Sequence, residues 1–253
     1  MIEGIETGYE GKYDFPARAE PPELVYMLAS VPRTGSTWLS HLLWQTGCLG
    51  APLEYLNFEQ AGPYGFANGS PSQQQWLWYS ALRRRTSPNG VFGFKCFPDQ
   101  FESLQETNPE LLTEVFASVL ARTHSPLVVW LRRRDRVARA ISLARAMLSG
   151  VWRAEQERGA EPRVDYSEAM VEQSRRVVEQ QESAWQQMFR DVNIKPLQLW
   201  YEEITDKPEE VVRQIARHLG VELDPSAAVA VPPIKKQAET DAREWRERFT
   251  RAK

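Results

Sequence analysis

The sequence has few cysteines, no long apolar run and no excess of positive charge. Two cysteines, Cys48 and Cys96, are too few for a disulfide framework and favour a reducing compartment. No stretch approaches the ~18 consecutive apolar residues that a membrane span requires. The formal net charge of −3 argues against a general nucleic-acid binder. We therefore expect a cytoplasmic protein without a membrane span, in which any anion site is a local concentration of Arg and Lys.

The N-terminus also lacks the apolar segment of a signal peptide. Residues 1–21 are acidic and Gly-containing, and a Pro pair ends at Pro22, where the first apolar run is about to begin. No internal repeat or low-complexity tract follows. We expect a loosely ordered arm over residues 1–21 and a single domain over residues 22–253, a length that can bury a large core.

A strand–turn–helix pattern over residues 24–43 organises the chain. The apolar run 24–29 predicts a buried strand, and apolar residues every three or four positions from Trp38 predict a helix. Backbone N–H groups and the positive end of the helix dipole would meet in the turn between them, where an anion fits. Gly35 allows a close approach of a ligand, and Arg33 adds a permanent charge. The alternative is a plain turn with an N-capping Ser or Thr, which is common in α/β folds.

The turn does not match the phosphate loop of kinases and ATPases. A Walker A loop has Lys directly after its second Gly, whereas Gly35 is followed by Ser36. Residues 32–38, PRTGSTW, resemble instead the 5′-phosphosulfate loop of sulfotransferases, commonly PKSGTTW. The resemblance implies 3′-phosphoadenosine 5′-phosphosulfate (PAPS) as sulfuryl donor, with no metal, and places Trp38 where the family has an adenine-packing Trp. The residues implied to hold the 5′-phosphosulfate are Arg33, Thr34, Gly35, Ser36 and Thr37.

A second basic stretch follows a second apolar run. Residues 127–131 predict a central strand, and three Arg residues, 132–134, precede an amphipathic helix. A cluster of Arg side chains at a helix N-terminus is electrostatically unfavourable unless a bound anion neutralises it. The stretch therefore indicates an anion site rather than a solvated helix start. Sulfotransferases carry their 3′-phosphate motif at such a place. The resemblance implies Arg133 and Ser142 as its ligands, while Arg134 fits the spacing of another branch of the family.

Two candidate catalytic residues lie near these sites. Lys95 stands at the exit of a strand predicted over residues 91–97, where parallel α/β sheets place ligand contacts. Cytosolic sulfotransferases carry a general-base His two residues further on, but Phe97 stands there in this chain. Glu54 lies in the loop after the first helix, and an ordinary surface Glu is the alternative interpretation.

A narrower resemblance, to the bacterial trehalose 2-sulfotransferase family, covers most of the chain. That family has an acidic-aromatic loop after its first helix, matched here by residues 54–56, and this likeness implies Glu54 as general base. It also ends in a segment like RQAD and a Trp-containing helix, matched by residues 236–239 and Trp245. Lys235 or Lys236 would then close over the 3′-phosphate.

Together these patterns predict an α/β fold, a P-loop-like three-layer sandwich with a central parallel sheet of about four or five strands and helices on both faces. The expected activity is PAPS-dependent sulfuryl transfer to a hydroxyl of a small-molecule or glycolipid acceptor, expected to be a carbohydrate or glycolipid, with Glu54, Arg33 and Lys95 as catalytic groups. Two alternatives stay open: a small-molecule kinase on the related P-loop fold, and a non-catalytic nucleotide- or glycan-binding protein. A homodimer is left open as well.

Overall fold

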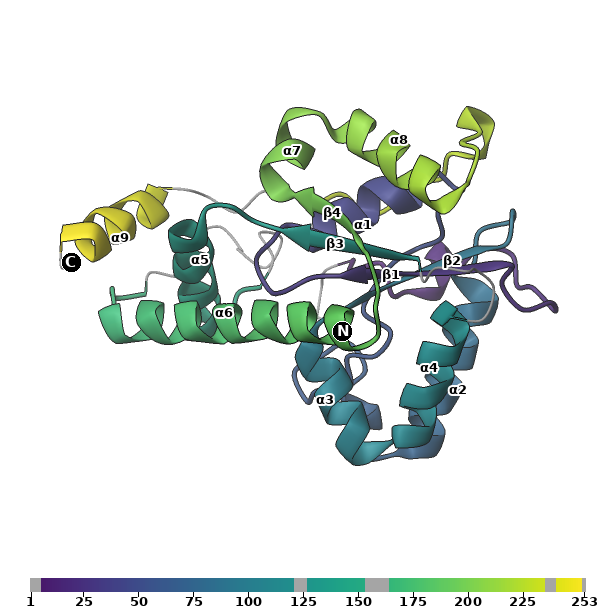
Figure 1. Ribbon diagram of the computed structural model, residues 1–253, viewed down its shortest axis with the longest axis horizontal. Coiled ribbons are helices and arrows are strands. Elements are labelled where there is room, and N and C mark those ends of the chain that lie inside the picture. Colours follow the sequence, from purple (N-terminus) through teal and green to yellow (C-terminus); the bar gives the residue numbers. More distant parts are fainter. Residues whose placement is uncertain (1–5, 121–126, 153–163, 235–239, 252–253) are drawn as a thin grey trace.

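A central parallel sheet of four strands forms the middle layer of the computed structural model, which describes residues 6–120, 127–152, 164–234 and 240–251 (Figure 1). The strand order is β2-β1-β3-β4, and every neighbouring pair is parallel. The carboxyl ends of all four strands therefore lie along one edge of the sheet. The strands are β1 (Leu24–Ala29), β2 (Val91–Cys96), β3 (Val128–Arg132) and β4 (Leu197–Trp200).

Helices cover both faces of this sheet, as the sequence predicts. In Figure 1, α1, α7 and α8 lie on one side and α2, α3, α4 and α6 on the other. The helices are α1 (Ser36–Gln45), α2 (Pro71–Arg84), α3 (Pro98–Thr107), α4 (Pro109–Leu120), α5 (Arg136–Ser149), α6 (Glu168–Asp191), α7 (Tyr201–Asp206), α8 (Pro208–Leu219) and α9 (Thr240–Arg251). None of the described helices is long and apolar enough to cross a membrane. The expected α/β sandwich is confirmed.

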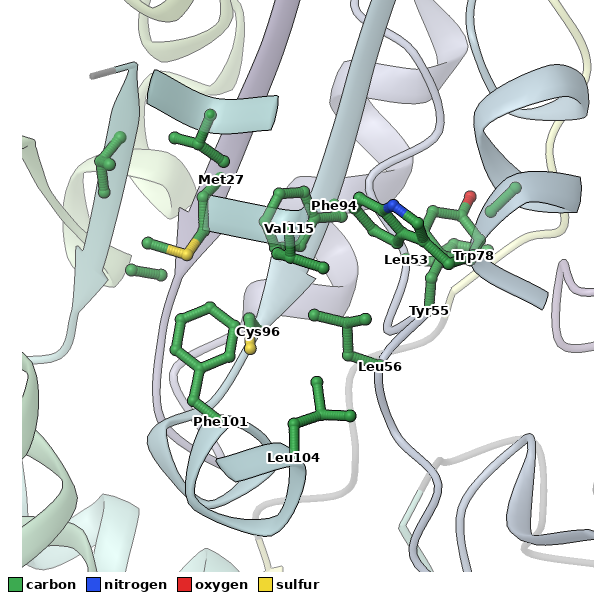
Figure 2. Packing of buried hydrophobic residues seen from close by; sticks show 14 of the residues in the cluster. Met27, Leu53, Tyr55, Leu56, Trp78, Phe94, Cys96, Phe101, Leu104 and Val115 are labelled. Carbon is green, nitrogen blue, oxygen red and sulfur yellow. The ribbon is translucent and has the colours of Figure 1, made fainter. Parts of the chain in front are cut away.

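Alternation along the strands divides the core into two layers. Tyr26 and Leu28 of β1 pack with α1 and α8, whereas Met27, one residue apart from each, packs on the opposite face. Figure 2 shows this second layer, in which Trp78 of α2 and Phe101 of α3 surround the β-strand side chains. All six residues of β2 are buried, which explains why Lys95 is the one charged residue in this strand.

The N-terminal segment makes specific contacts with the rest of the chain. Phe15 is buried in the same core cluster as Trp78 and Phe101, and Thr7 is buried as well. The buried Arg85 at the end of α2 donates to the carbonyl of Gly8 at 2.7 Å and pairs with Asp14 at 3.0 Å. These contacts hold residues 7–15 on the domain, while the expected division into an arm and one domain stays a prediction.

A third cluster joins α5 to α6 and α9. Ile141 of α5 packs with Trp245 and Phe249 of α9, which lies beside α5 in Figure 1. Between α5 and α6, Arg139 forms a buried ion pair with Glu182, and 1% of the Arg139 side chain is exposed. A charge buried so deeply is tolerated because the opposite charge neutralises it.

We expect Glu182→Ala to lower the free energy of unfolding by about 3–5 kcal/mol, because it leaves the Arg139 guanidinium buried without its carboxylate. The control is Glu179→Ala on the same helix, which removes a partly exposed pair with Arg175 and should cost at most about 0.5 kcal/mol. Urea unfolding measures both. Equal losses in the two variants would contradict the assignment of the buried pair as a stabilising contact.

Candidate active site at the carboxyl edge of the sheet

The turn between β1 and α1 is fixed by buried polar contacts. The hydroxyls of Ser30 and Thr34, both fully buried, lie 2.5 Å apart, and Thr34 also donates to the carbonyl of Val31 at 2.9 Å. Trp185 of α6 donates its ring N–H to the carbonyl of Ser30 at 2.6 Å. Gly35, the N-cap of α1, has no side chain that could cap the first N–H groups of the helix. The turn is therefore rigid on its inner side and presents the first N–H groups of α1 on its outer side.

Two residues of this turn have left-handed backbone conformations. Gly35, the N-cap of α1, has a φ of 80°, and Arg33 has a φ of 66°. A Cβ at Gly35 would lie 2.4 Å from the ring of Tyr201, the first residue of α7. Glycine is required here for two independent reasons, the backbone angle and the aromatic ring that lies over it.

Arg33 connects this turn to the second predicted anion site. Its Nε donates to the hydroxyl of Ser142 on α5 at 2.8 Å, and its Nη1 donates to the carbonyl of Trp152 at 2.8 Å. Arg133 donates to the carbonyl of Arg33 at 3.2 Å, and its guanidinium lies 4.7 Å from the ring centre of Tyr201. The structure thus brings together Arg33, Ser142 and Arg133, which the sequence assigned to two separate phosphate groups.

Positive charge is concentrated at this junction. Burial, and after it the charges of the nearby Arg133 and Arg145 guanidinium groups, lower the pKa of Arg33 to about 10. The Nε of Arg133 is buried and has no hydrogen-bond partner among the described residues. Mutually repelling, partly desolvated guanidinium groups favour an anion between them.

Arg134 has different surroundings from Arg133. Its guanidinium is half exposed and pairs with Glu203 at 2.6 Å, and its backbone N–H bonds to Glu202. Of the two arginines that the sequence left open, Arg133 therefore contacts the β1–α1 turn, and Arg134 contacts the acidic first turn of α7.

The loop that carries Glu54 runs along the outer edge of β2. Leu53 forms a parallel bridge with Phe94, and its carbonyl accepts the backbone N–H of Lys95 at 2.9 Å. This pairing places Glu54 beside Lys95, whose side chain is 2% exposed and whose Nζ lies 2.8 Å from Glu54 Oε1. The same Nζ donates to the hydroxyl of Thr37 in the first turn of α1 at 2.9 Å. Lys95 thus links the predicted base to the predicted phosphosulfate site.

Amide groups hold the other carboxylate oxygen of Glu54. Its Oε2 accepts from Asn57 Nδ2 at 2.8 Å and from Gln100 Nε2 at 3.3 Å, while its backbone N–H donates to the hydroxyl of Tyr9 at 3.0 Å. The Glu54 side chain is 16% exposed. Phe97, at the position of the cytosolic family's His, lies 5.8 Å from Lys95 Nζ by its ring centre. Glu54 is the carboxylate that the sheet brings next to Lys95.

The site also contains residues that the sequence did not predict. Asp99, in the first turn of α3, accepts from Gln181 at 3.1 Å, and burial followed by the charge of Glu59 raises its pKa to about 6. A signal existed for Tyr201, because it directly follows a strand and so lies at the edge where ligand contacts gather. For Asn57 and Gln100 no sequence pattern pointed to Glu54.

The remaining predicted residues are distributed as follows. Ser36 is buried at the start of α1, and Trp38 is half buried against the core layer formed by α1 and α8. Lys235 and Lys236 lie outside the described residues. Among the residues that the structure does describe, no group of three or more His, Cys, Asp or Glu side chains is arranged to hold a metal ion.

Comparison with known proteins identifies relatives along almost the whole chain. A family model described as Stf0 sulphotransferase matches residues 25–252. The trehalose 2-sulfotransferase of Mycolicibacterium smegmatis is 24% identical over 89% of this chain and 94% of its own length. That of Mycobacterium tuberculosis is 25% identical over 88% and 93%, respectively. Among solved structures, the sulfotransferase domain of the Synechococcus PCC 7002 olefin synthase is 14% identical over 93% of this chain and 98% of its own, with a TM-score of 0.45.

We expect Gly35→Ala to weaken binding of 3′-phosphoadenosine 5′-phosphate (PAP) at least about tenfold, because the new methyl group must displace Tyr201 and with it the stacked Arg133. The control is Gly220→Ala after α8. Its φ of 68° is similar, but no atom lies within 4 Å of the added Cβ. It should lose only about 1–2 kcal/mol of stability and no affinity. Calorimetry on folded proteins measures both, and unchanged affinity in Gly35→Ala would contradict the role of the turn.

Proposed function

Because this chain belongs to the Stf0 sulphotransferase family and is therefore a sulfotransferase, we propose that PAPS is its sulfuryl donor and a carbohydrate hydroxyl its acceptor. The observation that carries the proposal is the junction of the two anion turns through Arg33, Ser142 and Arg133. A nucleotide with charged groups at both its 5′ and 3′ positions needs two such sites close together. A nucleotide with a single phosphate chain does not.

The residues present fit such a donor. The N–H groups of the first turn of α1, with the hydroxyls of Ser36 and Thr37, would hold the 5′-phosphosulfate, and Gly35 leaves room for its approach. Arg133 and Ser142 would hold the 3′-phosphate. We choose Arg133 over Arg134 because Arg133 contacts the β1–α1 turn, whereas Arg134 is half exposed and pairs with Glu203. The guanidinium of Arg33 bonds to Ser142. We therefore assign the backbone of Arg33 to the 5′-phosphosulfate and its side chain to the 3′-phosphate.

In the proposed reaction, the acceptor oxygen attacks sulfur in line with the leaving 5′-phosphate. A new S–O bond to the acceptor forms as the S–O bond to the phosphate breaks, and PAP leaves. The hydroxyl proton moves to Glu54, which serves as general base. Lys95, between Glu54 and Thr37, would stabilise the negative charge that develops on the leaving side. No step needs a metal ion.

The acceptor class rests on the names of the relatives. Both curated relatives are trehalose 2-sulfotransferases, and identities of 24% and 25% leave the acceptor of this chain open within the sugars and glycolipids. The small-molecule kinase alternative finds no support in a sulfotransferase family. The two free, buried thiols, Cys48 and Cys96, are compatible with the cytoplasmic location that we also propose. A screen with labelled PAPS and sugars, polyols and glycolipids, in the presence of a chelator, tests donor, acceptor and metal independence together.

PAP should bind about tenfold to a hundredfold more tightly than adenosine 5′-phosphate, because a charge-assisted contact to the 3′-phosphate contributes about 1.5–3 kcal/mol. Arg133→Ala should remove most of this preference, whereas Arg134→Ala, at the neighbouring exposed position, should keep it. Calorimetry with both nucleotides measures the ratio. The assignment fails if the Arg134 variant loses the preference and the Arg133 variant retains it.

Glu54→Gln should lower kcat about 10²- to 10⁴-fold with PAP affinity nearly unchanged, because general-base catalysis contributes about that factor. The wild-type rate should rise with pH as the carboxylate ionises. Glu102→Gln, an exposed change on α3, is the control and should behave as wild type. Steady-state kinetics with the acceptor found in the screen measures these values. A Glu54→Gln enzyme with the wild-type rate would show that the base lies elsewhere.

A further inference from the structure

Gln100 is a buried amide that contacts the Glu54 carboxylate from α3. It is 2% exposed, and its Nε2 lies 3.3 Å from Glu54 Oε2. We propose that Gln100 is a positioning residue for sulfuryl transfer, which fixes the Glu54 carboxylate in its working orientation and in its ionised form. This inference rests on the proposed role of Glu54 as general base.

The local structure allows only one orientation of the Gln100 amide. Its Oε1 accepts the backbone N–H of Phe97 at 3.3 Å, which closes the N-terminus of α3. A flipped amide would place its NH₂ group against that N–H donor and its oxygen against the Glu54 carboxylate, so both contacts would be repulsive. The backbone N–H of Gln100 is held in turn by Asp99 Oδ1 at 3.0 Å. The donor therefore points at Glu54 because the helix start requires it.

The contact complements the others on the same carboxylate. Lys95 lies at Oε1, and Asn57 joins Gln100 at Oε2. Donors on both oxygens fix the plane of the carboxylate between the end of β2 and the start of α3, and hydrogen bonds to the charged form favour ionisation. Gln100 is also held by the N-terminus of its own helix, through the Phe97 N–H.

A purely structural role as a helix cap makes a different prediction. Glutamate is the standard residue for this capping position, so Gln100→Glu keeps the acceptor for the Phe97 N–H. The same change replaces the donor that faces Glu54 by a second carboxylate, which disfavours ionisation of Glu54. Gln100→Glu therefore preserves the cap and removes the positioning contact. Gln100→Leu removes both.

The experiment must distinguish the ionisation of Glu54 from that of other titratable groups near it. They are Lys95 and Cys96 on β2, Asp99 on α3, and Tyr9 in the N-terminal segment. Burial, and after it the charge of Glu59, raise the pKa of Asp99 to about 6, so Asp99 can contribute to a pH profile in the same range. Asp99→Asn identifies any part of a pH profile that belongs to Asp99 rather than to Glu54.

The test uses full-length protein with ¹³C-labelled glutamate carboxyl groups. The Glu54 signal is the one lost in Glu54→Gln, and its titration needs no acceptor. In Gln100→Glu we expect a folded protein with wild-type PAP affinity, lower thermal stability at neutral pH, a Glu54 signal that titrates at higher pH than in wild type, and kcat about tenfold to a hundredfold lower at neutral pH. The rate should recover as pH rises. Gln100→Leu should lose rate at every pH.

Two results would overturn the proposal. The first removes only the positioning role of Gln100, and the second removes the role of Glu54 as base as well. If Gln100→Glu leaves the Glu54 titration and the pH–rate profile as in wild type while Glu54→Gln is slow, Gln100 is only a helix cap and the proposed base stands. If Glu54→Gln turns over at the wild-type rate, the base assignment falls, and the positioning role falls with it.

Discussion

The site depends on one buried ammonium group, that of Lys95. Removing an ammonium from water costs several kcal/mol unless other groups replace its hydration, and here a carboxylate and a hydroxyl do so. Glu54 and Thr37 come from two different segments, the loop after α1 and the first turn of α1 itself. Because neither can leave without exposing or isolating the charge, Lys95 fixes the anion turn and the carboxylate loop relative to β2.

Positive and negative side chains lie on opposite sides of Lys95 in this site. The guanidinium groups of Arg33 and Arg133 gather on the side of β1, β3 and α5, while Glu54 and Asp99 lie on the side of β2 and α3. In the proposed function, the first side would bind the anionic nucleotide, and the second would face the acceptor hydroxyl that loses its proton. A chain with a net charge of −3 achieves this by local placement rather than by composition.

The parts of this arrangement that follow from local chemistry were predictable. The apolar run of β1 and the glycine at 35 predicted the strand, the turn and the helix start, and adjacent parallel strands necessarily bring their ends to one edge. Side-chain directions were not predictable in the same way. The guanidinium of Arg33 lies on Ser142 because the left-handed backbone at Arg33 directs it away from its own turn. Gln100 meets Glu54 only because a loop pairs with the edge of β2, which is a tertiary event without a sequence pattern.

The ring of Tyr201 over Gly35 has a consequence for how the protein is made. The anion turn is synthesised early, but Tyr201, whose ring lies over it, follows Gly35 by 166 residues (201 − 35), directly after β4. A nascent chain that has emerged only through β3 therefore holds the turn without this wall and without the stacking partner of Arg133. In the proposed function the nucleotide meets a complete site only after β4 has docked, so we expect ligand-dependent protection from proteolysis in chains that contain Tyr201 and not in shorter fragments.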